Sequence, residues 1–329
     1  METEPGSSPH GAAEPPPQPD ARPLTDRLER PRRPLLLDGA TGTELERAGV
    51  ECGLPLWSAH ALLDAPQILL QIHQRYVEAG AEILTANTFR TQRRTLARAD
   101  MGERDGDLTR LAVQLAREAV SLARHAAPRV FVAGSLPPLE DCYRPDLVPE
   151  PSQLECEHVR QVALLVEAGV DLILVETMNS LREALTAVRA AAAAGLPVVA
   201  SFVSWERDRL LSGEPLHEAA SRVLEAGALV VGVNCLPPSA LTDALAVLEP
   251  LGAPLIVSPN LGEPDEQGGF VRSEEIGPNL FVRTLEPWLA DEALPTAIVG
   301  GCCGTTPAHT QALARRVGTA VAARRSSKK

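Results

Sequence analysis

The chain of 329 residues carries 43 acidic and 31 basic side chains, which gives a formal net charge of −12 at pH 7. This acidic balance, with no cluster of Lys or Arg in the globular part, argues against a nucleic-acid partner. No apolar run reaches the roughly 18 residues that a membrane span needs, and the N-terminus lacks the apolar core of a signal peptide. We therefore expect a cytoplasmic protein whose six cysteines stay reduced, a setting that favours metal or catalytic roles over disulfides.

Residues 1–33 are rich in Pro, Gly, Ser and charge, a composition that cannot bury enough apolar surface to offset chain entropy. We predict a disordered tail there, a single domain over 34–320 and a frayed basic end at 321–329. The predicted strands are Leu35–Leu37, Ile83–Ala86, Val130–Ala133, Leu172–Val175, Val198–Phe202, Leu229–Val233, Leu255–Val257 and Ala297–Val299. The predicted helices are Pro66–Ala79, Leu108–Ala126, Ser152–Ala168, Leu181–Ala194, Pro215–Ala226, Ala240–Leu248 and Pro307–Val317.

The eight predicted strands are apolar throughout rather than alternating, which is typical of parallel strands buried on both faces. Helices between parallel strands indicate βαβ units, and a count of eight favours a closed (β/α)8 TIM barrel, a fold of about 250 residues. An open doubly wound sheet is the alternative. It would need a Gly-x-Gly-x-x-Gly turn after the first strand to bind a dinucleotide, and residues 38–43 lack that spacing.

Polar residues follow every predicted strand, and in a barrel these positions meet at one mouth. They are Asp38; Asn87, Thr88 and Phe89; Gly134 and Ser135; Glu176 and Thr177; Ser201 or Ser204; Asn234 and Cys235; Ser258 and Asn260; and Gly300 through Gly304. Loops after strands are often polar for structural reasons, so a single member carries little weight. The convergence of all eight positions predicts a functional site.

Three cysteines stand at two of these strand ends. Cys235 ends the sixth strand, and Cys302 and Cys303 follow the eighth between glycines, which let the backbone bend so that both sulfurs face one point. Three thiolates can fill three positions of a tetrahedral zinc site and leave the fourth open for substrate, and soft sulfur ligands select zinc over magnesium or calcium. Packing or a structural metal remains the alternative, and packing roles are expected for the remaining cysteines, Cys52, Cys142 and Cys156.

Several motifs together resemble the homocysteine S-methyltransferase family, the homocysteine-binding barrel domain. The resemblance runs from about Leu35 to Val317. It rests on residues 36–43 (LLDGATGT), 56–59 (LWSA), 79–89 (AGAEILTANTF), 174–177 (LVET), 232–235 (GVNC) and 300–305 (GGCCGT).

The resemblance implies zinc ligands at Cys235, Cys302 and Cys303 and a homocysteine-binding acid at Glu176, with Asp38 and Gly39 at the first strand. Homocysteine has an ammonium group, a carboxylate and a thiol. Glu176 and Asp38 supply acceptors for the ammonium, and backbone N–H groups of the turn at 39–43 suit the carboxylate. Zinc deprotonates a bound thiol, and the thiolate then attacks a methyl group on a cationic donor. A buried ion pair with an Arg is the alternative role for Glu176.

The methyl donor is expected to bind at the same mouth, because the chain has no room for the folate and cobalamin domains of the larger relatives. S-methylmethionine, S-adenosylmethionine and betaine are the candidates, and their positive charge favours an aromatic or carboxylate wall. Trp57, Phe89 and Trp205 are candidates for that wall. Thr177 and Arg90 stand where the betaine enzymes carry Tyr, which counts against betaine. The full predicted substrate-binding set is Asp38, Gly39, Thr43, Trp57, Asn87, Phe89, Ser135, Glu176, Ser201 and Asn234.

Other functions stay open at this point. A betaine-dependent enzyme, a methyltransferase of another small thiol or selenol, and a non-catalytic zinc or thiol sensor would use the same cysteines. A zinc barrel hydrolase would normally ligate its metal through His and carboxylates, but no His-x-His follows the first strand and the seven histidines are scattered. The sequence does not indicate the oligomeric state.

Overall fold

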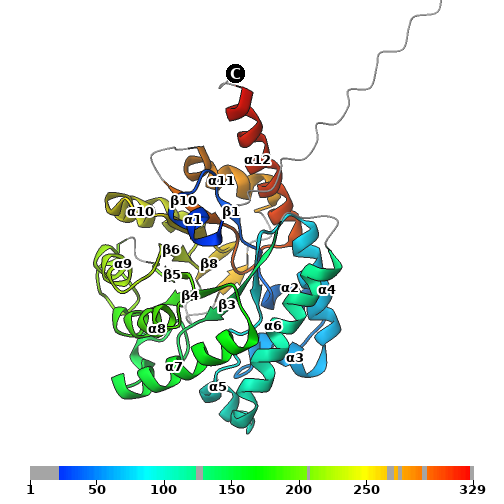
Figure 1. The fold of residues 1–329 in the computed structure, drawn as a ribbon, viewed down its shortest axis with the longest axis vertical. Helices are drawn as coiled ribbons and strands as arrows, with labels where there is room; N and C mark the ends of the chain where they lie inside the picture. Colours follow the sequence, from blue (N-terminus) through cyan, green and yellow to red (C-terminus); the bar gives the residue numbers. More distant parts are fainter. Residues whose placement is uncertain are drawn as a thin grey trace, which may run out of the picture.

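The computed structural model describes residues 22–123, 129–205, 208–264, 270–272, 276–290 and 295–326. Its main element is a parallel eight-stranded sheet that closes on itself (Figure 1). In sheet order the strands are β1 (Leu35–Leu36), β10 (Thr296–Val299), β7 (Leu255–Ser258), β6 (Val230–Asn234), β5 (Val198–Phe202), β4 (Leu172–Met178), β3 (Phe131–Leu136) and β2 (Ile83–Ala86). The bridge between Leu37 and Ile83 joins the first strand to the second, which confirms the predicted TIM barrel.

Helices outside the strands form the outer layer of the barrel, and all but the last, which follows the final strand, lie in the connections between strands. They are α4 (Pro66–Glu78), α6 (Asp105–Leu122), α7 (Pro151–Ala168), α8 (Leu181–Ala193), α9 (Leu216–Glu225), α10 (Pro238–Leu248), α11 (Pro278–Ala290) and α12 (Pro307–Ser326). Several begin with proline, whose missing N–H costs nothing in the first helical turn. Shorter helices α2 (Gly42–Arg47), α3 (His60–Asp64) and α5 (Arg93–Ala97), and the 3-10 turn η1 (Trp57–Ala59), lie in the loops at the mouth.

The predictions for the two ends of the chain are partly wrong. Within 1–33, the segment α1 (Leu24–Glu29) is helical and buries Leu28 completely, while residues 1–21 lie outside the described part. At the other end, α12 continues to Ser326, so most of the expected frayed end 321–329 is helical. Helix α11 and a hairpin of β8 (Gly262–Pro264) with β9 (Phe270–Arg272) were also absent from the prediction.

Two layers of apolar side chains surround the strands. The inner layer fills the barrel with residues such as Leu35, Phe131 and Ile256, and Leu28 of α1 packs against its lower end. The outer layer lies between the strands and the helices. Helix α1 therefore closes the end of the barrel at which the strands begin, opposite their carboxyl ends, because its apolar side has no other surface to bury against.

A buried ionic cluster joins α1 to the same end of the barrel. Glu82 is 2 % exposed and pairs with Arg27 at 2.8 Å and with Arg33. Burial by itself raises the pKa of Glu82, but hydrogen bonds and charge from the two arginines outweigh it and hold the pKa below its usual 4.5. The segment before β1 is thus held by charge as well as by apolar packing.

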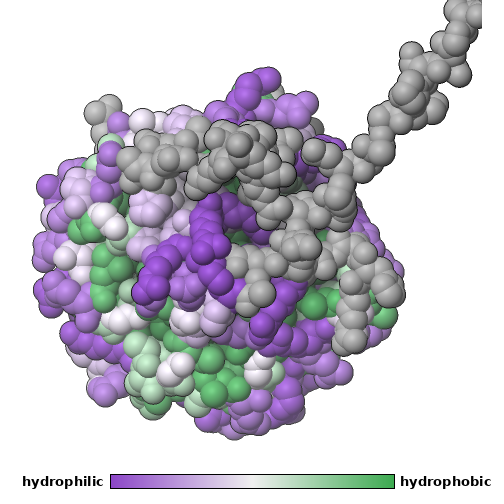
Figure 2. Space-filling view, turned by 45° about the horizontal axis from the view of Figure 1, so that its top comes forward, coloured by the Kyte–Doolittle hydropathy of each residue, from purple (hydrophilic) through white to green (hydrophobic). Residues whose placement is uncertain are grey.

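The surface seen in Figure 2 mixes hydrophilic side chains with separate smaller hydrophobic areas. Among the helices of the described residues, none combines the length and the apolarity needed to cross a bilayer.

Candidate metal centre and substrate cavity

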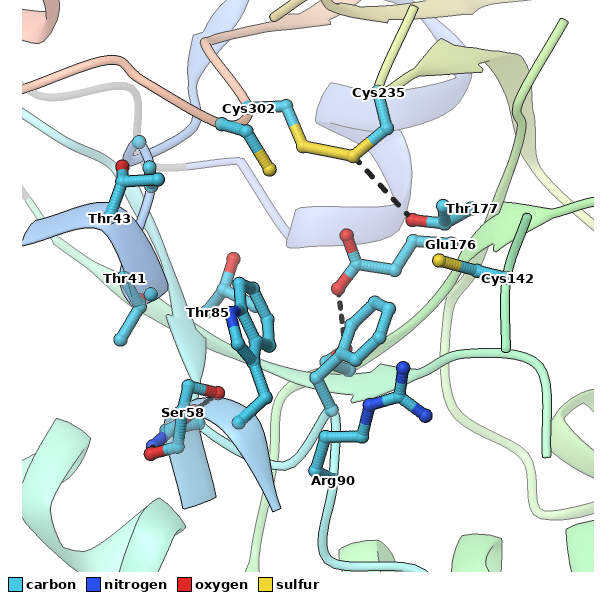
Figure 3. A pocket seen from close by; sticks show the side chains of 18 of the residues that line it. Thr41, Thr43, Ser58, Thr85, Arg90, Cys142, Glu176, Thr177, Cys235 and Cys302 are labelled. Carbon is cyan, nitrogen blue, oxygen red and sulfur yellow. Dashed lines mark hydrogen bonds between the residues drawn. A yellow bond between two sulfur atoms is a disulfide. The ribbon is translucent and has the colours of Figure 1, made fainter. Parts of the chain in front are cut away.

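A cavity of about 640 Å³ opens at the carboxyl ends of the strands, where a barrel normally carries its active site. Its lining comes from the loops after β1, β2, β3, β4, β6, β7 and β10 (Figure 3). The predicted site residues that line it are Asp38, Gly39, Thr43, Trp57, Asn87, Phe89, Ser135, Glu176, Cys235, Cys302 and Cys303. Ser201 and Asn234 are buried and are not part of the lining.

The three predicted metal ligands meet at one end of this cavity. The Sγ atoms of Cys235, Cys302 and Cys303 all lie within 4.8 Å of one another. Cys235 and Cys302 are joined as a disulfide, with Cα atoms 5.6 Å apart, and Cys303 is a free thiol beside them (Figure 3). The disulfide departs from the expectation that all six cysteines are reduced. Because a disulfide supplies no thiolates, this pair would have to be reduced before it could ligate a metal.

The backbone N–H groups of all three cysteines donate hydrogen bonds to the end of β7 and the loop after it. The N–H of Cys235 donates to Ser258 at 3.2 Å, and that of Cys302 donates to Pro259 at 2.9 Å. The N–H of Cys303 donates to Oδ1 of Asn260 at 3.0 Å. A side chain at Gly301 would overlap Thr305, so the chain can bring both cysteines to the cavity only with glycine there.

Asn234 acts beneath the cavity rather than in it. Its Oδ1 accepts the N–H of Thr177 at 2.9 Å and the hydroxyl of Ser201 at 2.7 Å, and its Nδ2 donates to the Thr177 hydroxyl at 2.8 Å. These bonds connect β6 to β4 and β5 directly below Cys235. Asn234 and Ser201 therefore hold the strand ends in position, a structural role that the sequence pattern did not separate from substrate binding.

Two carboxyl groups, the buried Asp38 and the half-buried Glu176, lie in the same cavity as the cysteines. Asp38 accepts hydrogen bonds from the N–H and hydroxyl of Thr85 at 2.8 and 2.9 Å, and Glu176 accepts one from the Ser135 hydroxyl. Burial raises the pKa of each carboxyl to about 7, and the Glu176 charge adds to the effect on Asp38. Burial also raises the pKa of the Cys303 thiol to about 12, with a further contribution from Glu176. A cation bound here would favour the ionised forms of these groups and lower their pKa values.

Trp57 and Phe89 form an aromatic wall on the side of the cavity nearest α3. Their rings meet edge to face with centroids 5.7 Å apart. Asn87 supports this wall, because its amide exchanges two hydrogen bonds with Ser58, at 2.7 and 2.8 Å. Trp205 contacts the site from outside, through a 3.4 Å hydrogen bond from its indole to the Cys235 carbonyl, and does not line the cavity.

Thr43 and the turn before it are partly engaged in holding the cysteine loop. The Thr43 hydroxyl accepts the N–H of Gly304 at 3.1 Å, and the N–H of Ala40 donates to Thr305 at 3.1 Å. Because the Ala40 N–H already has a partner, it cannot also bind a substrate carboxylate. The loop after β3 adds lining residues that the sequence reading missed, namely Asp141, Cys142 and Tyr143. Cys142 was expected only to pack, and no motif marked this loop.

Comparison with known proteins bears directly on this site. The family model for homocysteine S-methyltransferase matches residues 35–317. The chain belongs to the homocysteine S-methyltransferase family. Homocysteine S-methyltransferase 3 of Zea mays is 32 % identical over 306 residues, covering 85 % of this chain and 89 % of that protein. A selenocysteine methyltransferase of Astragalus bisulcatus is 28 % identical over 322 residues, covering 86 % and 92 %.

Solved structures of the homocysteine methyltransferase MmuM from Escherichia coli share the fold. The metallated form superposes with a TM-score of 0.75 at 28 % identity and covers 89 % of this chain and 99 % of its own. The oxidised form gives a TM-score of 0.77 at 28 % identity, with 90 % and 100 % covered. Membership of this methyltransferase family confirms the resemblance found in the sequence.

Proposed function

We propose that the protein moves a methyl group from a sulfonium donor, S-methylmethionine or S-adenosylmethionine, to the sulfur of homocysteine and so produces methionine. The observation that carries this proposal is the meeting of three cysteine sulfurs within 4.8 Å beside two carboxyl groups whose pKa is about 7. This set supplies acceptors for the homocysteine ammonium and a place for its thiol in one cavity.

The residues present fit a zinc ion. Cys235, Cys302 and Cys303 offer soft sulfur donors at mutual distances suited to one metal, and a three-ligand site keeps a position for substrate. When bound, zinc lowers the pKa of an incoming thiol and keeps its sulfur nucleophilic. The proposal concerns the reduced chain, in which the Cys235–Cys302 pair has been opened.

The chain's own residues do the rest of the work. Glu176 and Asp38 accept the homocysteine ammonium and so aim its sulfur at the cysteine end of the cavity. Trp57 and Phe89 face the positive donor, which aromatic rings attract. Holding acceptor and donor in line supplies most of the rate, because methyl transfer between fixed partners needs little further chemistry from the protein.

A selenol is the second acceptor to consider. Relatives named as selenocysteine methyltransferases cover most of the chain at 28 % and 30 % identity. Selenocysteine carries the same ammonium and carboxylate, so the acceptor end described above would receive it too. Competition between homocysteine and selenocysteine for one labelled donor measures which acceptor the cavity prefers.

The test uses full-length protein, reduced and loaded with zinc, together with homocysteine and a donor whose methyl groups carry deuterium. We expect labelled methionine from a sulfonium donor, loss of activity on chelation and its return when zinc is added. Cys303→Ser should abolish turnover, whereas Cys156→Ser, at an exposed position on α7, should leave it unchanged. Absence of labelled methionine with every sulfonium donor and with betaine would refute the proposal and favour a non-catalytic sensor.

A further inference from the structure

Arg90 places a buried positive charge in the cavity at a distance from the cysteines. It follows Phe89 after β2, is 8 % exposed and lines the cavity (Figure 3). Its Nη1 donates to the Glu140 carbonyl at 3.4 Å, and its guanidinium lies 5.4 Å from the centre of the Phe89 ring. Its Nε has no hydrogen-bond partner, and the ion pairs recorded for the described residues do not include it. Buried charges normally have a partner of opposite sign, so a ligand group is expected here.

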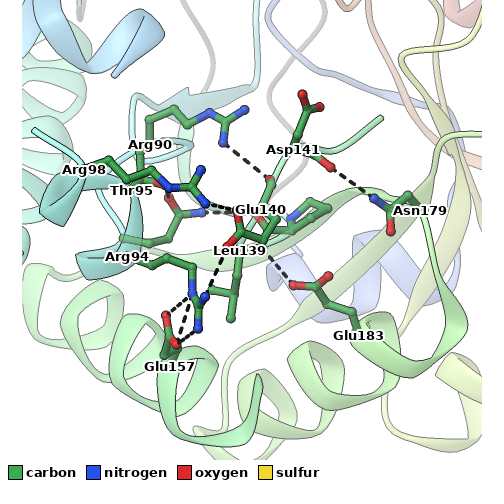
Figure 4. Close-up of polar contacts among 12 residues, drawn as sticks. Arg90, Arg94, Thr95, Arg98, Leu139, Glu140, Asp141, Glu157, Asn179 and Glu183 are labelled. Atoms are coloured by element: carbon green, nitrogen blue, oxygen red, sulfur yellow. Dashed lines mark hydrogen bonds and ion pairs between the residues drawn. The ribbon is translucent and has the colours of Figure 1, made fainter. Parts of the chain in front are cut away.

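The neighbouring charges are already balanced among themselves. The Glu140 carboxylate binds Arg94 at 3.1 Å and Arg98, and Glu157 also binds Arg94 (Figure 4). Glu140 therefore offers Arg90 only its backbone carbonyl. Arg94 and Arg98 thus share the carboxylates of Glu140 and Glu157, and neither carboxylate is paired with Arg90, which lines the cavity.

Asp141 adds a negative charge to the lining of the same cavity. It lines the cavity, and its Oδ1 accepts the N–H of Tyr143 at 2.9 Å. The loop that carries it is fixed from β4 and α8: Glu183 accepts the N–H of Leu139 at 2.8 Å, and Asn179 donates to the Cys142 carbonyl at 3.1 Å (Figure 4). No salt bridge joins Asp141 to Arg90 in the described structure. Two opposite charges thus line the same cavity, and no ion pair recorded for the described residues joins them.

Cys142 and Tyr143 line the same cavity as this charge pair and the three cysteines. Burial raises the pKa of Tyr143. The charges of Cys303 and Asp141 raise this pKa further, and the charge of Arg90 lowers it. Tyr143 is thus within electrostatic reach of both ends of the cavity. The cavity lining thus contains Asp38 and Glu176, from the ends of β1 and β4, and a second pair of charged residues, Arg90 and Asp141, from the loops after β2 and β3.

We propose that Arg90 and Asp141 bind the α-carboxylate and the α-ammonium of the methyl donor, so that the site selects sulfonium donors that carry an amino-acid head. This inference rests on the proposed methyl transfer. An arginine fork matches a carboxylate, and a carboxylate accepts from an ammonium. Betaine has a carboxylate, but its nitrogen has no N–H to offer Asp141, so this site discriminates against it.

The reaction balances with this placement. The acceptor thiol loses its proton to solvent, and a lone pair on its sulfur forms the new bond to the methyl carbon. The bond from that carbon to the sulfonium sulfur breaks, and its electron pair stays on the departing sulfur, which becomes a neutral thioether. Because the amino-acid head does not react, Arg90 and Asp141 orient the donor without taking part in bond making.

Four sulfonium probes separate the contributions of the two charges. S-methylmethionine carries both head groups, 3-(dimethylsulfonio)propanoate carries the carboxylate, 3-aminopropyl(dimethyl)sulfonium carries the amine, and trimethylsulfonium carries neither. Arg90→Gln should lower kcat/KM about 10- to 100-fold for the two carboxylated probes, the range expected for a lost hydrogen bond to a charged group. The variant should leave kcat/KM for the other two probes within about twofold of the wild-type value. Asp141→Asn should do the same to the two probes with an amine.

Arg93→Gln is the matched control, because Arg93 lies three residues away and pairs with Glu103 at the surface. It should leave all four values unchanged. Arg90→Lys, which keeps the charge and loses the fork, should recover part of the activity with carboxylated donors and serves if the Gln variant does not fold. Equal loss with all four probes, or a raised KM for homocysteine alone, would overturn the inference.

Calorimetry separates failure of this inference from failure of the proposed function. If the wild type makes no methionine but binds S-methylmethionine, and Arg90→Gln binds it at least tenfold more weakly, the transfer reaction is wrong and the donor-head site stands. If the wild type turns over S-methylmethionine and Arg90→Gln matches it in both KM and affinity, the reaction stands and the donor-head site is wrong.

Discussion

Replacing Glu176 with Gln tests the acceptor end through its pH dependence. Burial raises the pKa of Glu176 from its usual 4.5 to about 7, a difference that corresponds to about 3 kcal/mol at 1.36 kcal/mol for each factor of ten. An ammonium group bound beside Glu176 can contribute at most this free energy to binding, because its charge stabilises the ionised carboxylate and so offsets the effect of burial. The Gln variant should therefore bind homocysteine up to about 100-fold more weakly at pH 8.

The sign follows from the raised pKa. Below pH 7 the wild-type carboxyl is increasingly protonated in the free protein, so its advantage over Gln shrinks by about tenfold for each pH unit. The ratio of the two dissociation constants should be about 100 at pH 8 and about 10 at pH 6. Taking the ratio cancels the ionisation of the homocysteine thiol, which is common to both proteins. Titration calorimetry of zinc-loaded protein measures both constants.

Ser135→Ala provides the matched control. The Ser135 hydroxyl donates to Glu176 and lowers its pKa, so removal of this donor should move the midpoint of the pH dependence upward. The zinc content of both variants should equal that of the wild type. A ratio that is the same at pH 6 and pH 8, or a loss of zinc that parallels the loss of binding, would refute the assignment of Glu176 to the ammonium.

Three other predictions concern the framework around the site. Glu82→Gln leaves the buried Arg27 without its carboxylate and should lower the free energy of unfolding by about 3–5 kcal/mol at pH 7. Because the pKa of Glu82 is lowered, the difference in stability between wild type and variant should shrink below pH 4.5, which urea titrations would measure. Asn234→Ala removes three buried hydrogen bonds and should lower zinc affinity as well as stability. Loss of a residue that only binds substrate would leave the zinc affinity unchanged, and metal analysis after dialysis distinguishes the two roles. Trp57→Ala removes one face of the aromatic wall and should raise KM for a cationic donor about 2- to 30-fold, as expected for 0.5–2 kcal/mol of cation–π attraction, while an unchanged KM would place the donor elsewhere.

Two general properties of a barrel, the burial of its strands on both faces and the convergence of their carboxyl ends, explain what could be predicted from the sequence. The bounds of β2 and β5 match the prediction because a strand buried on both faces must be apolar from end to end. Cys235 could be assigned to one site with Cys302, 67 residues further along the chain, and with Cys303, because the carboxyl ends of parallel strands meet at one mouth. Both inferences depend on rules that hold for every barrel, not on details of this chain.

The features that escaped prediction depend on contacts between distant segments. Helix α1 lies in a segment whose composition is that of a tail, and its order comes from the pairing of Arg27 with Glu82 across 55 residues. Asp141 reaches the cavity because Asn179 and Glu183, from other elements, hold its loop. Asn234 follows a strand as a substrate-binding residue would, and only its three partners show a structural role.

Backbone strain marks the cavity independently of any motif. Trp57, Thr177 and Cys235 have φ values of 44°, 58° and 52°, and they are three of the four non-glycine residues with positive φ in the described part of the chain. Each such conformation costs of order 1–3 kcal/mol and persists only where surrounding contacts enforce it. Asn234 supplies such contacts to Thr177, the Ser258 carbonyl accepts the N–H of Cys235, and all three strained residues line the cavity. The strain is located where the chain must turn a side chain toward a ligand, so relaxing it would be expected to stabilise the fold and impair the site.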